Sequence, residues 1–229
     1  MLGLWDQLVA GMTWLLQFFY GWTKAAGLPN YGIAIILLTI TVKMILFPLT
    51  IKQMRSMKIT QQLQPKIKEI QEKYKDPQKA QMAIMELYKE YGASPLAGCL
   101  PLLLQMPILI GLYQALNKFE FKGGFLWLTS LKEADPWYLL PVLAGATTFL
   151  VQWMTTNMQD QTQRTMLYVM PVFIGWLTVK FPSGLGLYWV VSNIVSAIQQ
   201  YFINRMPIGE PLKEEAATNE GNRKKRKNS

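Results

Sequence analysis

The feature that most constrains this chain is its division into long apolar runs separated by charged stretches. Runs of about 18 or more apolar residues are typical of helices that cross a membrane, because a helix satisfies its own backbone hydrogen bonds in lipid. We expect five such spans, at about 31–51, 95–117, 136–155, 165–181 and 185–203. The sequence therefore predicts an all-α membrane protein.

The basic residues predict how these spans are oriented. Seventeen of the 23 Lys and Arg residues lie in 52–92, in 156–164 or from Arg205 onward. Loops rich in Lys and Arg stay on the cytoplasmic side of a membrane. We therefore expect the N-terminus outside and the C-terminus in the cytoplasm. The net charge of +9 follows this topology, so it does not indicate a DNA partner.

Residues 1–28 form a separate N-terminal segment that is dense in aromatic side chains. A signal peptide begins with a basic region, whereas the first charge here is Asp6. Aromatic residues mixed with polar ones are typical of a helix that lies in the headgroup layer. We expect an interfacial amphipathic helix; an additional span and a cleaved signal peptide are the alternatives.

Residues 53–92 are polar and charged, and their pattern predicts a cytoplasmic helical hairpin that turns at Asp76-Pro77. Apolar side chains recur at helical spacing on both arms, and they are candidates for contact with a client or partner protein. These candidates are Ile67, Ile70, Ile84 and Tyr88.

The tail from 207 to 229 is polar and basic, and we expect it to be disordered. Its basic cluster is a candidate for binding ribosomal RNA or anionic lipid, with a merely solvated tail as the alternative. The cluster consists of Arg223, Lys224, Lys225, Arg226 and Lys227.

The composition excludes most enzyme chemistry. The chain has no histidine and a single cysteine, Cys99. That excludes His-based triads, His/Cys zinc sites and internal disulfides. The sequence also lacks the glycine-rich loops that bind nucleotides. We expect no enzyme activity, no metal and no cofactor.

Lys43 lies inside the first apolar run, in the stretch TITVKMILFPLT. It is about 8 residues, or roughly 12 Å, from the cytoplasmic end of that run, whereas a lysine stem reaches only about 6 Å. A charge at this depth costs about 2.5 to 3.5 kcal/mol on insertion scales. None of the five expected spans contains an acidic residue. We therefore expect a hydrated cavity between helices, with snorkelling to the headgroups as the alternative.

Polar residues in the other spans agree with a wet interior. Thr39 shares a helix face with Lys43, Gln105 lies in the second span, and Ser192 and Asn193 lie in the fifth. Taken singly, each of these residues commonly forms a hydrogen bond between two helices. Together with an unpaired lysine they favour one shared polar cavity.

Four long motifs occur in order along the chain: LQPKIKEIQEKYKD, IMELYKEYGASPLAGCLPLLLQMPILIGLYQAL, DPWYLLPVLAGATTFLVQ and MPVFIGWLTVKFPSGLGLYWVVSNIVSAIQQ. With these motifs the chain closely resembles the YidC/Oxa/Alb family of membrane protein insertases over about residues 29–206. The order of spans, hairpin and basic tail is similar to bacterial members, in the shorter form without the large extracytoplasmic domain.

The resemblance implies five helices around a hydrophilic groove in a bacterial plasma membrane. Where the family normally has a groove arginine, this chain has Lys43, which keeps the charge but lacks the planar fork of five donors. The implied function is to insert nascent membrane proteins and help them fold, with the Sec translocon, the ribosome and anionic lipids as implied partners. The implied groove or client-contact positions are Thr39, Gln105, Met106, Trp189 and Ser192.

The main alternative function is a small transporter or channel in which Lys43 is a substrate or ion site. Transporters usually show inverted repeats and ionisable partners within the bilayer. The sequence has neither an obvious repeat nor an acidic residue in an expected span. A membrane-bound enzyme ranks third, because no catalytic constellation is present.

Overall fold

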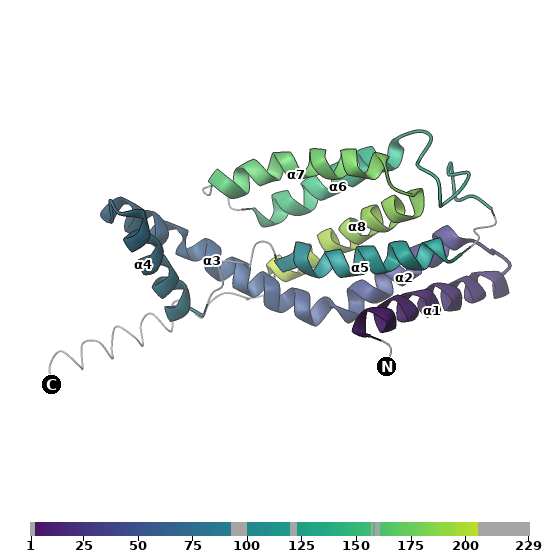
Figure 1. The fold of residues 1–229 in the computed structure, drawn as a ribbon, viewed down its shortest axis with the longest axis horizontal. Helices are drawn as coiled ribbons and strands as arrows, with labels where there is room; N and C mark the ends of the chain where they lie inside the picture. Colours follow the sequence, from purple (N-terminus) through teal and green to yellow (C-terminus); the bar gives the residue numbers. More distant parts are fainter. Residues whose placement is uncertain (1–2, 93–99, 120–122, 157, 159–160, 206–229) are drawn as a thin grey trace. The chain divides into compact units, whose positions relative to one another are not determined.

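The computed structural model describes residues 3–92, 100–119, 123–156, 158 and 161–205 (Figure 1). This part of the chain is helical, and its only β feature is an isolated bridge between Phe125 and Leu128. The all-α prediction is confirmed. The helices are α1 (Leu4–Ala25), α2 (Tyr31–Ile45), α3 (Phe47–Lys73), α4 (Pro77–Glu90), α5 (Leu100–Asn117), α6 (Leu139–Thr155), α7 (Gln161–Val179) and α8 (Ser183–Arg205).

The segment expected to form one helix over 31–51 is divided in the structure. α2 ends at Ile45, and α3 begins at Phe47 and continues through the first arm of the hairpin. The cause is Pro48, which has no N–H to donate and is tolerated best in the first turn of a helix. This corrects the expectation of a continuous helix to residue 51.

The other expected spans correspond to single helices with shifted ends. α6 starts three residues later than expected and α7 starts four residues earlier. Residues 93–99 and the tail from 206 to 229, with its basic cluster, lie outside the described residues. Among the described helices none is long and apolar enough to meet the criteria for a membrane span alone; α2 and α3 meet them as a bent pair, and α6 is a shorter apolar helix.

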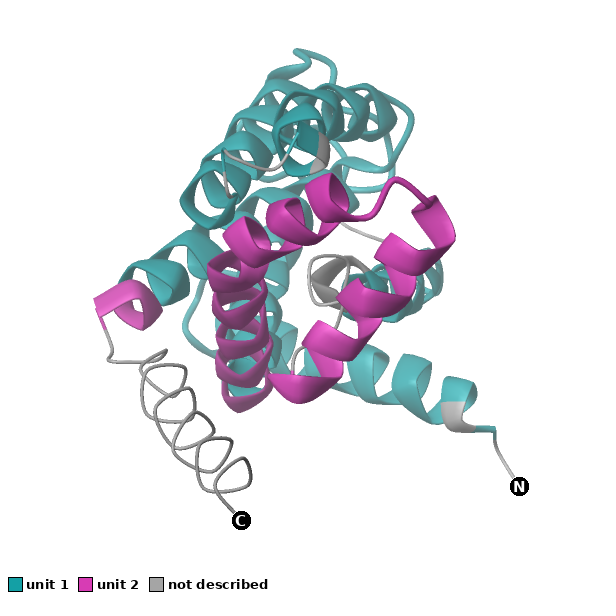
Figure 2. Ribbon diagram, turned by 90° about the vertical axis from the view of Figure 1, so that its left-hand side faces the viewer, with its two compact units in different colours: residues 1–47, 102–201 teal, residues 48–101, 202–229 magenta. Residues whose placement is uncertain are grey.

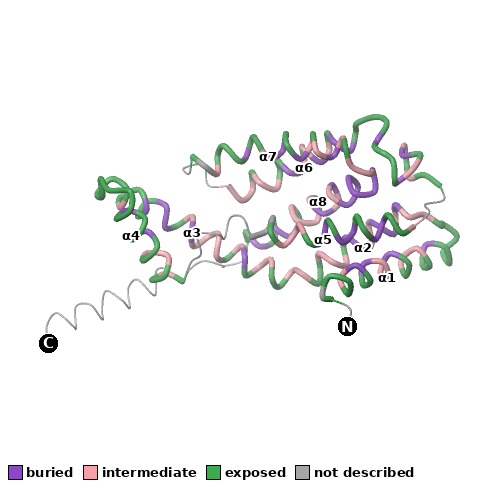
Figure 3. The backbone as a smooth tube through the Cα atoms, in the orientation of Figure 1, coloured by how far each residue is buried: buried purple, intermediate pink, exposed green. Residues whose placement is uncertain are grey.

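The chain forms two compact units (Figure 2). Unit 1 contains residues 1–47 and 102–201, and unit 2 contains residues 48–101 and 202–229. In unit 1, α8 lies between the α6–α7 pair and the helices α2 and α5 (Figure 1). Burial is densest in the first half of α8 (Figure 3). The core of unit 1 includes Leu16, Ile35, Leu38, Leu112, Leu116, Leu140 and Tyr188.

α6 and α7 cross at a pair of glycines, one in an equivalent position of each helix. The motif Pro-Val-x-x-Gly occurs in both helices, ending at Gly145 in α6 and at Gly175 in α7. A Cβ on Gly145 would lie 3.1 Å from the backbone oxygen of Pro171, and a Cβ on Gly175 would lie 3.2 Å from that of Pro141. Glycines therefore let the two backbones approach closely, as small residues do between membrane helices.

A buried carboxylate organises the loop before α6. Asp135 is 5% exposed, and its side chain accepts hydrogen bonds from the indole of Trp127 at 3.0 Å and from the backbone N–H of Trp137 at 3.0 Å and Leu140 at 2.6 Å. The Leu140 N–H is a donor in the first turn of α6, where a negative charge is favourable, and the Trp137 N–H lies just before that helix. Asp135 therefore joins the loop to the helix.

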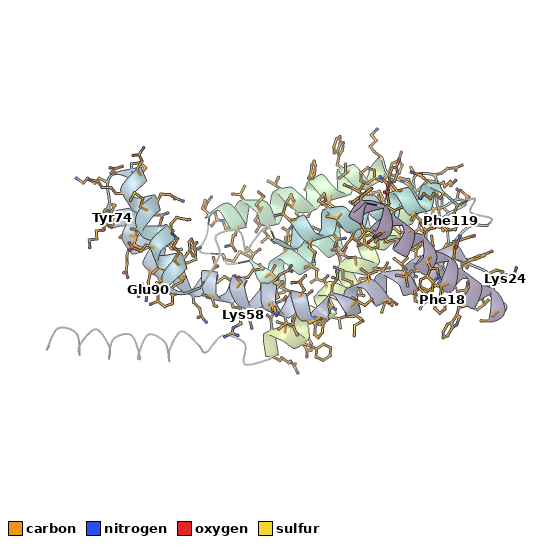
Figure 4. The ribbon with its side chains drawn as sticks, turned by 60° about the horizontal axis from the view of Figure 1, so that its bottom comes forward. Phe18, Lys24, Lys58, Tyr74, Glu90 and Phe119 are labelled. Atoms are coloured by element: carbon orange, nitrogen blue, oxygen red, sulfur yellow. The ribbon has the colours of Figure 1, made fainter. Side chains whose placement is uncertain are left out.

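Unit 2 contains the helical hairpin of α3 and α4. The Asp76 side chain accepts a hydrogen bond from the backbone N–H of Gln78 and caps α4, with Pro77 in the first turn. Leu63, Ile67 and Ile84 form the buried cluster between the arms. Tyr74 near the turn is exposed (Figure 4).

The glycine crossing predicts a steric effect. Gly145→Val forces the carbonyl of Pro171 to move, so we expect the free energy of unfolding to fall by about 1 to 3 kcal/mol, as for other overpacked sites. Gly11→Val in α1 is the matched control, because a Cβ there meets nothing within 4 Å. The measurement is reversible unfolding in detergent. Equal stability of the two variants would contradict the close crossing.

The Asp135 hydrogen bonds predict a second stability effect. Asp135→Ala leaves the Trp127 indole and two backbone donors without their acceptor, so we expect a loss of about 2 to 3 kcal/mol. Glu133→Ala is the control, since Glu133 is an exposed acid two residues away. Unfolding of both variants in detergent gives the comparison. A loss no larger than that of the control would show that the carboxylate does not organise the loop.

Candidate functional site

Lys43 lies near the end of α2 and points to α8. Its Nζ donates a hydrogen bond to the Ser196 hydroxyl at 2.9 Å, and both residues are partly buried. An ammonium carries three N–H donors. Since Ser196 is its one side-chain partner among the described residues, two donors are left for water or for another acceptor.

A second contact from α8 reaches the backbone of the same residue. The Gln199 amide nitrogen donates to the Lys43 carbonyl oxygen at 3.1 Å. Gln199 is 5% exposed, so this contact is inside unit 1. Both partners of Lys43 are neutral, and the charge is therefore not cancelled within the described residues.

Gln105 of α5 contacts α8 about two turns before Ser196. Its amide nitrogen donates to the Tyr188 hydroxyl at 2.6 Å, and Ser192 is a second hydrogen-bond partner of that hydroxyl. Tyr188 is almost completely buried. Residues three or four apart share a helix face. Tyr188, Ser192, Ser196 and Gln199 therefore form one row, which we call the polar stripe of α8.

The neighbouring face of α8 makes a separate polar cluster with α6. The Trp189 indole donates to the Thr148 hydroxyl at 3.0 Å. The Asn193 amide lies 2.9 Å from the same hydroxyl and 3.1 Å from that of Thr147. The orientation that satisfies these groups turns the Asn193 oxygen toward Thr148, from which it accepts.

The predicted groove residues are thus divided between two faces of α8. Ser192 belongs to the polar stripe, which Lys43 and Gln105 contact, whereas Trp189 and Asn193 face α6. Thr39 is fully buried, and its hydroxyl donates to the Ile35 carbonyl of its own helix at 2.6 Å. Met106 is partly buried and packs against the core.

The sequence reasoning missed several residues that complete these clusters. Ser196 and Gln199 continue the spacing that starts at Ser192, so a search at i+4 and i+7 along the fifth apolar run would have found them. No spacing pattern identifies Thr147 and Thr148, because threonines in an apolar run commonly form ordinary hydrogen bonds between helices. Their role depends on the packing of α6 against α8.

The hairpin candidates hold the two arms of unit 2 together. Ile67 and Ile84 are buried, and Ile70 and Tyr88 pack against them. The exposed apolar side chains of α4 are instead Met82 and Met85. These residues do recur at helical spacing, and in the structure they form the face of each arm that packs against the other arm.

Comparison with known proteins gives concordant matches. The family model described as 60Kd inner membrane protein matches residues 22–210. A membrane protein insertase YidC of Wolinella succinogenes is 52% identical over 181 residues, which are 77% of this chain and 34% of that protein. The protein of the same name from Geobacter sulfurreducens is 41% identical over 208 residues, 89% of this chain and 38% of that protein.

A solved structure agrees with these matches. It is the crystal structure of an active YidC insertase with the first transmembrane domain resolved, and it is 32% identical with a TM-score of 0.69. The match covers 88% of this chain and 47% of that chain. The chain spans little more than a third of the length of the curated relatives it matches. Because the family model matches most of its length, this chain belongs to the 60Kd inner membrane protein family.

Proposed function

We propose that this chain inserts nascent membrane proteins into a bacterial inner membrane and helps them fold. Membership of the family and similarity to proteins named membrane protein insertase support this function. The observation that carries it is the Lys43 ammonium, which is held inside an apolar helical unit by the neutral Ser196 hydroxyl. That arrangement keeps a positive charge available for an acidic ligand.

The proposed path is a hydrated groove among five spans, formed by α2, α5, α6, α7 and α8. A polar client segment cannot cross hydrocarbon readily, because its charges and free backbone groups lose water. Ser196 of the polar stripe and Gln105 are only partly buried, so their side chains supply partners for water along such a groove. Water partway into the bilayer shortens the dry part of the path.

The outer surface of the α6–α7 pair supports a lipid environment. Val142 and Val172 are 65% and 74% exposed, and Trp153 and Trp176 are exposed on the same helices. Large exposed apolar surfaces mark contact with a membrane or a partner. Apolar side chains on these helices would therefore contact lipid tails.

In the proposed mechanism Lys43 transiently attracts acidic residues in the translocated tail of the client. The apolar segment of the client then moves along α2, α5 and α8 into lipid, driven by its own burial. The membrane potential contributes about 2.3 kcal/mol per charge per 100 mV and helps to move acidic tails outward. The mechanism uses no nucleotide and no metal.

The proposed partners follow from charge and position. The α3–α4 hairpin and the basic tail would face the cytoplasm, with the N-terminus outside. The hairpin would receive clients from the ribosome or exchange them with the Sec translocon. The tail, with 223–227 as its basic cluster, would contact ribosomal RNA or anionic lipids. α1 would lie in the outer headgroup layer, where its exposed Phe18 (Figure 4) and the exposed Trp14 and Trp22 on either side of it suit the interface.

Substitution of Lys43 tests the electrostatic step. We expect Lys43→Ala to reduce insertion of an acidic-tailed client about tenfold in reconstituted vesicles. A tenfold change corresponds to a loss of about 1.4 kcal/mol of interaction free energy between the lysine and the acidic tail. Lys43→Arg keeps the charge and should retain most activity. Lys180→Ala, at an exposed lysine after α7, is the control for loss of a positive charge. Full insertion by Lys43→Ala would remove the electrostatic step.

Thiol labelling tests whether water reaches the polar stripe. In a Cys99→Ser background we expect Ser196→Cys to react with a membrane-impermeant maleimide from the cytoplasmic side, because the reagent stays in water and an apolar environment makes a thiol unreactive. Ile194→Cys is the control, since Ile194 is an exposed apolar residue of the same helix. Equal labelling of the two cysteines would contradict a groove that is wet on one face of α8.

A further inference from the structure

The end of α2 exposes backbone carbonyls that have no partner within the helix. A helix leaves its last four C=O groups unsatisfied. The Leu46 N–H returns to the Val42 carbonyl at 3.0 Å, and Phe47 already begins α3. Pro48 has no N–H to offer. The Lys43 carbonyl, which a continuous helix would pair with the N–H of Phe47, therefore needs a partner from elsewhere.

That partner is Gln199 of α8. Its amide nitrogen lies 3.1 Å from the Lys43 carbonyl oxygen, and the residue is 5% exposed. Three residues earlier on the same helix, the Ser196 hydroxyl accepts from the Lys43 ammonium at 2.9 Å. Adjacent turns of α8 thus hold the backbone and the side-chain end of one residue.

Stability alone does not account for a glutamine at this position. The Gln199 side-chain oxygen is buried and has no hydrogen-bond partner in the described part of the chain. A buried acceptor without a donor is unfavourable. Methionine has nearly the same length and would remove that oxygen. What glutamine supplies, and methionine does not, is the N–H donor to the Lys43 carbonyl.

We infer that Gln199 is a positioning residue: it caps α2 from α8, fixes where the helix ends and so holds the Lys43 ammonium beside Ser196. This inference rests on the proposed function only where it concerns the choice of client. The geometric part, that Gln199 fixes the place of Lys43, is independent of it. Loss of the cap should let the end of α2 move while the core of unit 1 stays packed.

The first experiment compares clients in reconstituted vesicles. The readout is the ratio of insertion of an acidic-tailed client to insertion of the same client with a neutral tail, because general damage lowers both. We expect Gln199→Met to reduce this ratio about threefold to tenfold. This is the change in an equilibrium constant that the loss of one ordinary hydrogen bond produces. Gln200→Met is the matched control, since Gln200 is the next residue and is also buried. An unchanged ratio in Gln199→Met, with a reduced ratio in Lys43→Ala, would overturn the inference.

The second experiment observes Lys43 directly and separates the two proposals. Lysines of the full chain in lipid nanodiscs are reductively methylated with 13C-formaldehyde, and the Lys43 signal is assigned by its absence in Lys43→Arg. A shifted or broadened Lys43 signal in Gln199→Met, but not in Gln200→Met, supports the inference even if Lys43→Ala leaves the client ratio unchanged and so contradicts the proposed function. An unaltered Lys43 signal in Gln199→Met would overturn it.

Discussion

A lysine ammonium held inside an apolar helical unit is the constraint to which the rest of the site responds. Its insertion costs about 2.5 to 3.5 kcal/mol, and one hydrogen bond from this charged group to Ser196 returns about 1.5 to 3 kcal/mol. A carboxylate partner would offset more, but it would also cancel the charge. The structure gives Lys43 neutral partners, Ser196 at the ammonium and Gln199 at the backbone. The remaining donors are left for water and, in the proposed mechanism, for the acidic residues of a client.

α8 connects the elements of unit 1. Its polar stripe contacts α2 at Lys43 and α5 at Gln105, and its neighbouring face contacts α6 at Thr148. Hydrogen bonds between membrane helices average well under 2 kcal/mol each, so these contacts specify orientation more than they stabilise. The close backbone approach of α6 and α7 is made by glycines, which supply packing without polar groups.

The elements could be predicted from the sequence where one physical rule dominates. Apolar runs and charged loops predicted helices in the right places and a hairpin turning at Asp76-Pro77. The break at Leu46 was missed because the apolar run continues through it, while a single missing N–H at Pro48 decides the local structure. Pro48 favours a new helix start because a proline is tolerated best in the first turn, but Pro65, Pro107 and Pro171 lie inside α3, α5 and α7 without ending them.

The site could be predicted in part. Lys43, Gln105 and Ser192 stood out as polar residues in apolar runs, and the structure brings them to one stripe with Tyr188. Gln199 was not predicted, because it lies near the end of its apolar run, where a glutamine is expected simply to contact the membrane interface. Thr39 shares a face with Lys43 in sequence but is fully buried, since packing against other helices decides exposure and spacing does not.

Crosslinking from α8 to a nascent chain tests most directly that this stripe receives acidic client segments. A photoreactive amino acid replaces Ser192, and ribosome-bound chains of a client with an acidic tail are presented to membrane vesicles. An adduct between position 192 and the tail, lost when the tail is made neutral, is the expected result. Adducts only from the exposed position 194, or none from 192 while the client still inserts, would contradict the role of the stripe.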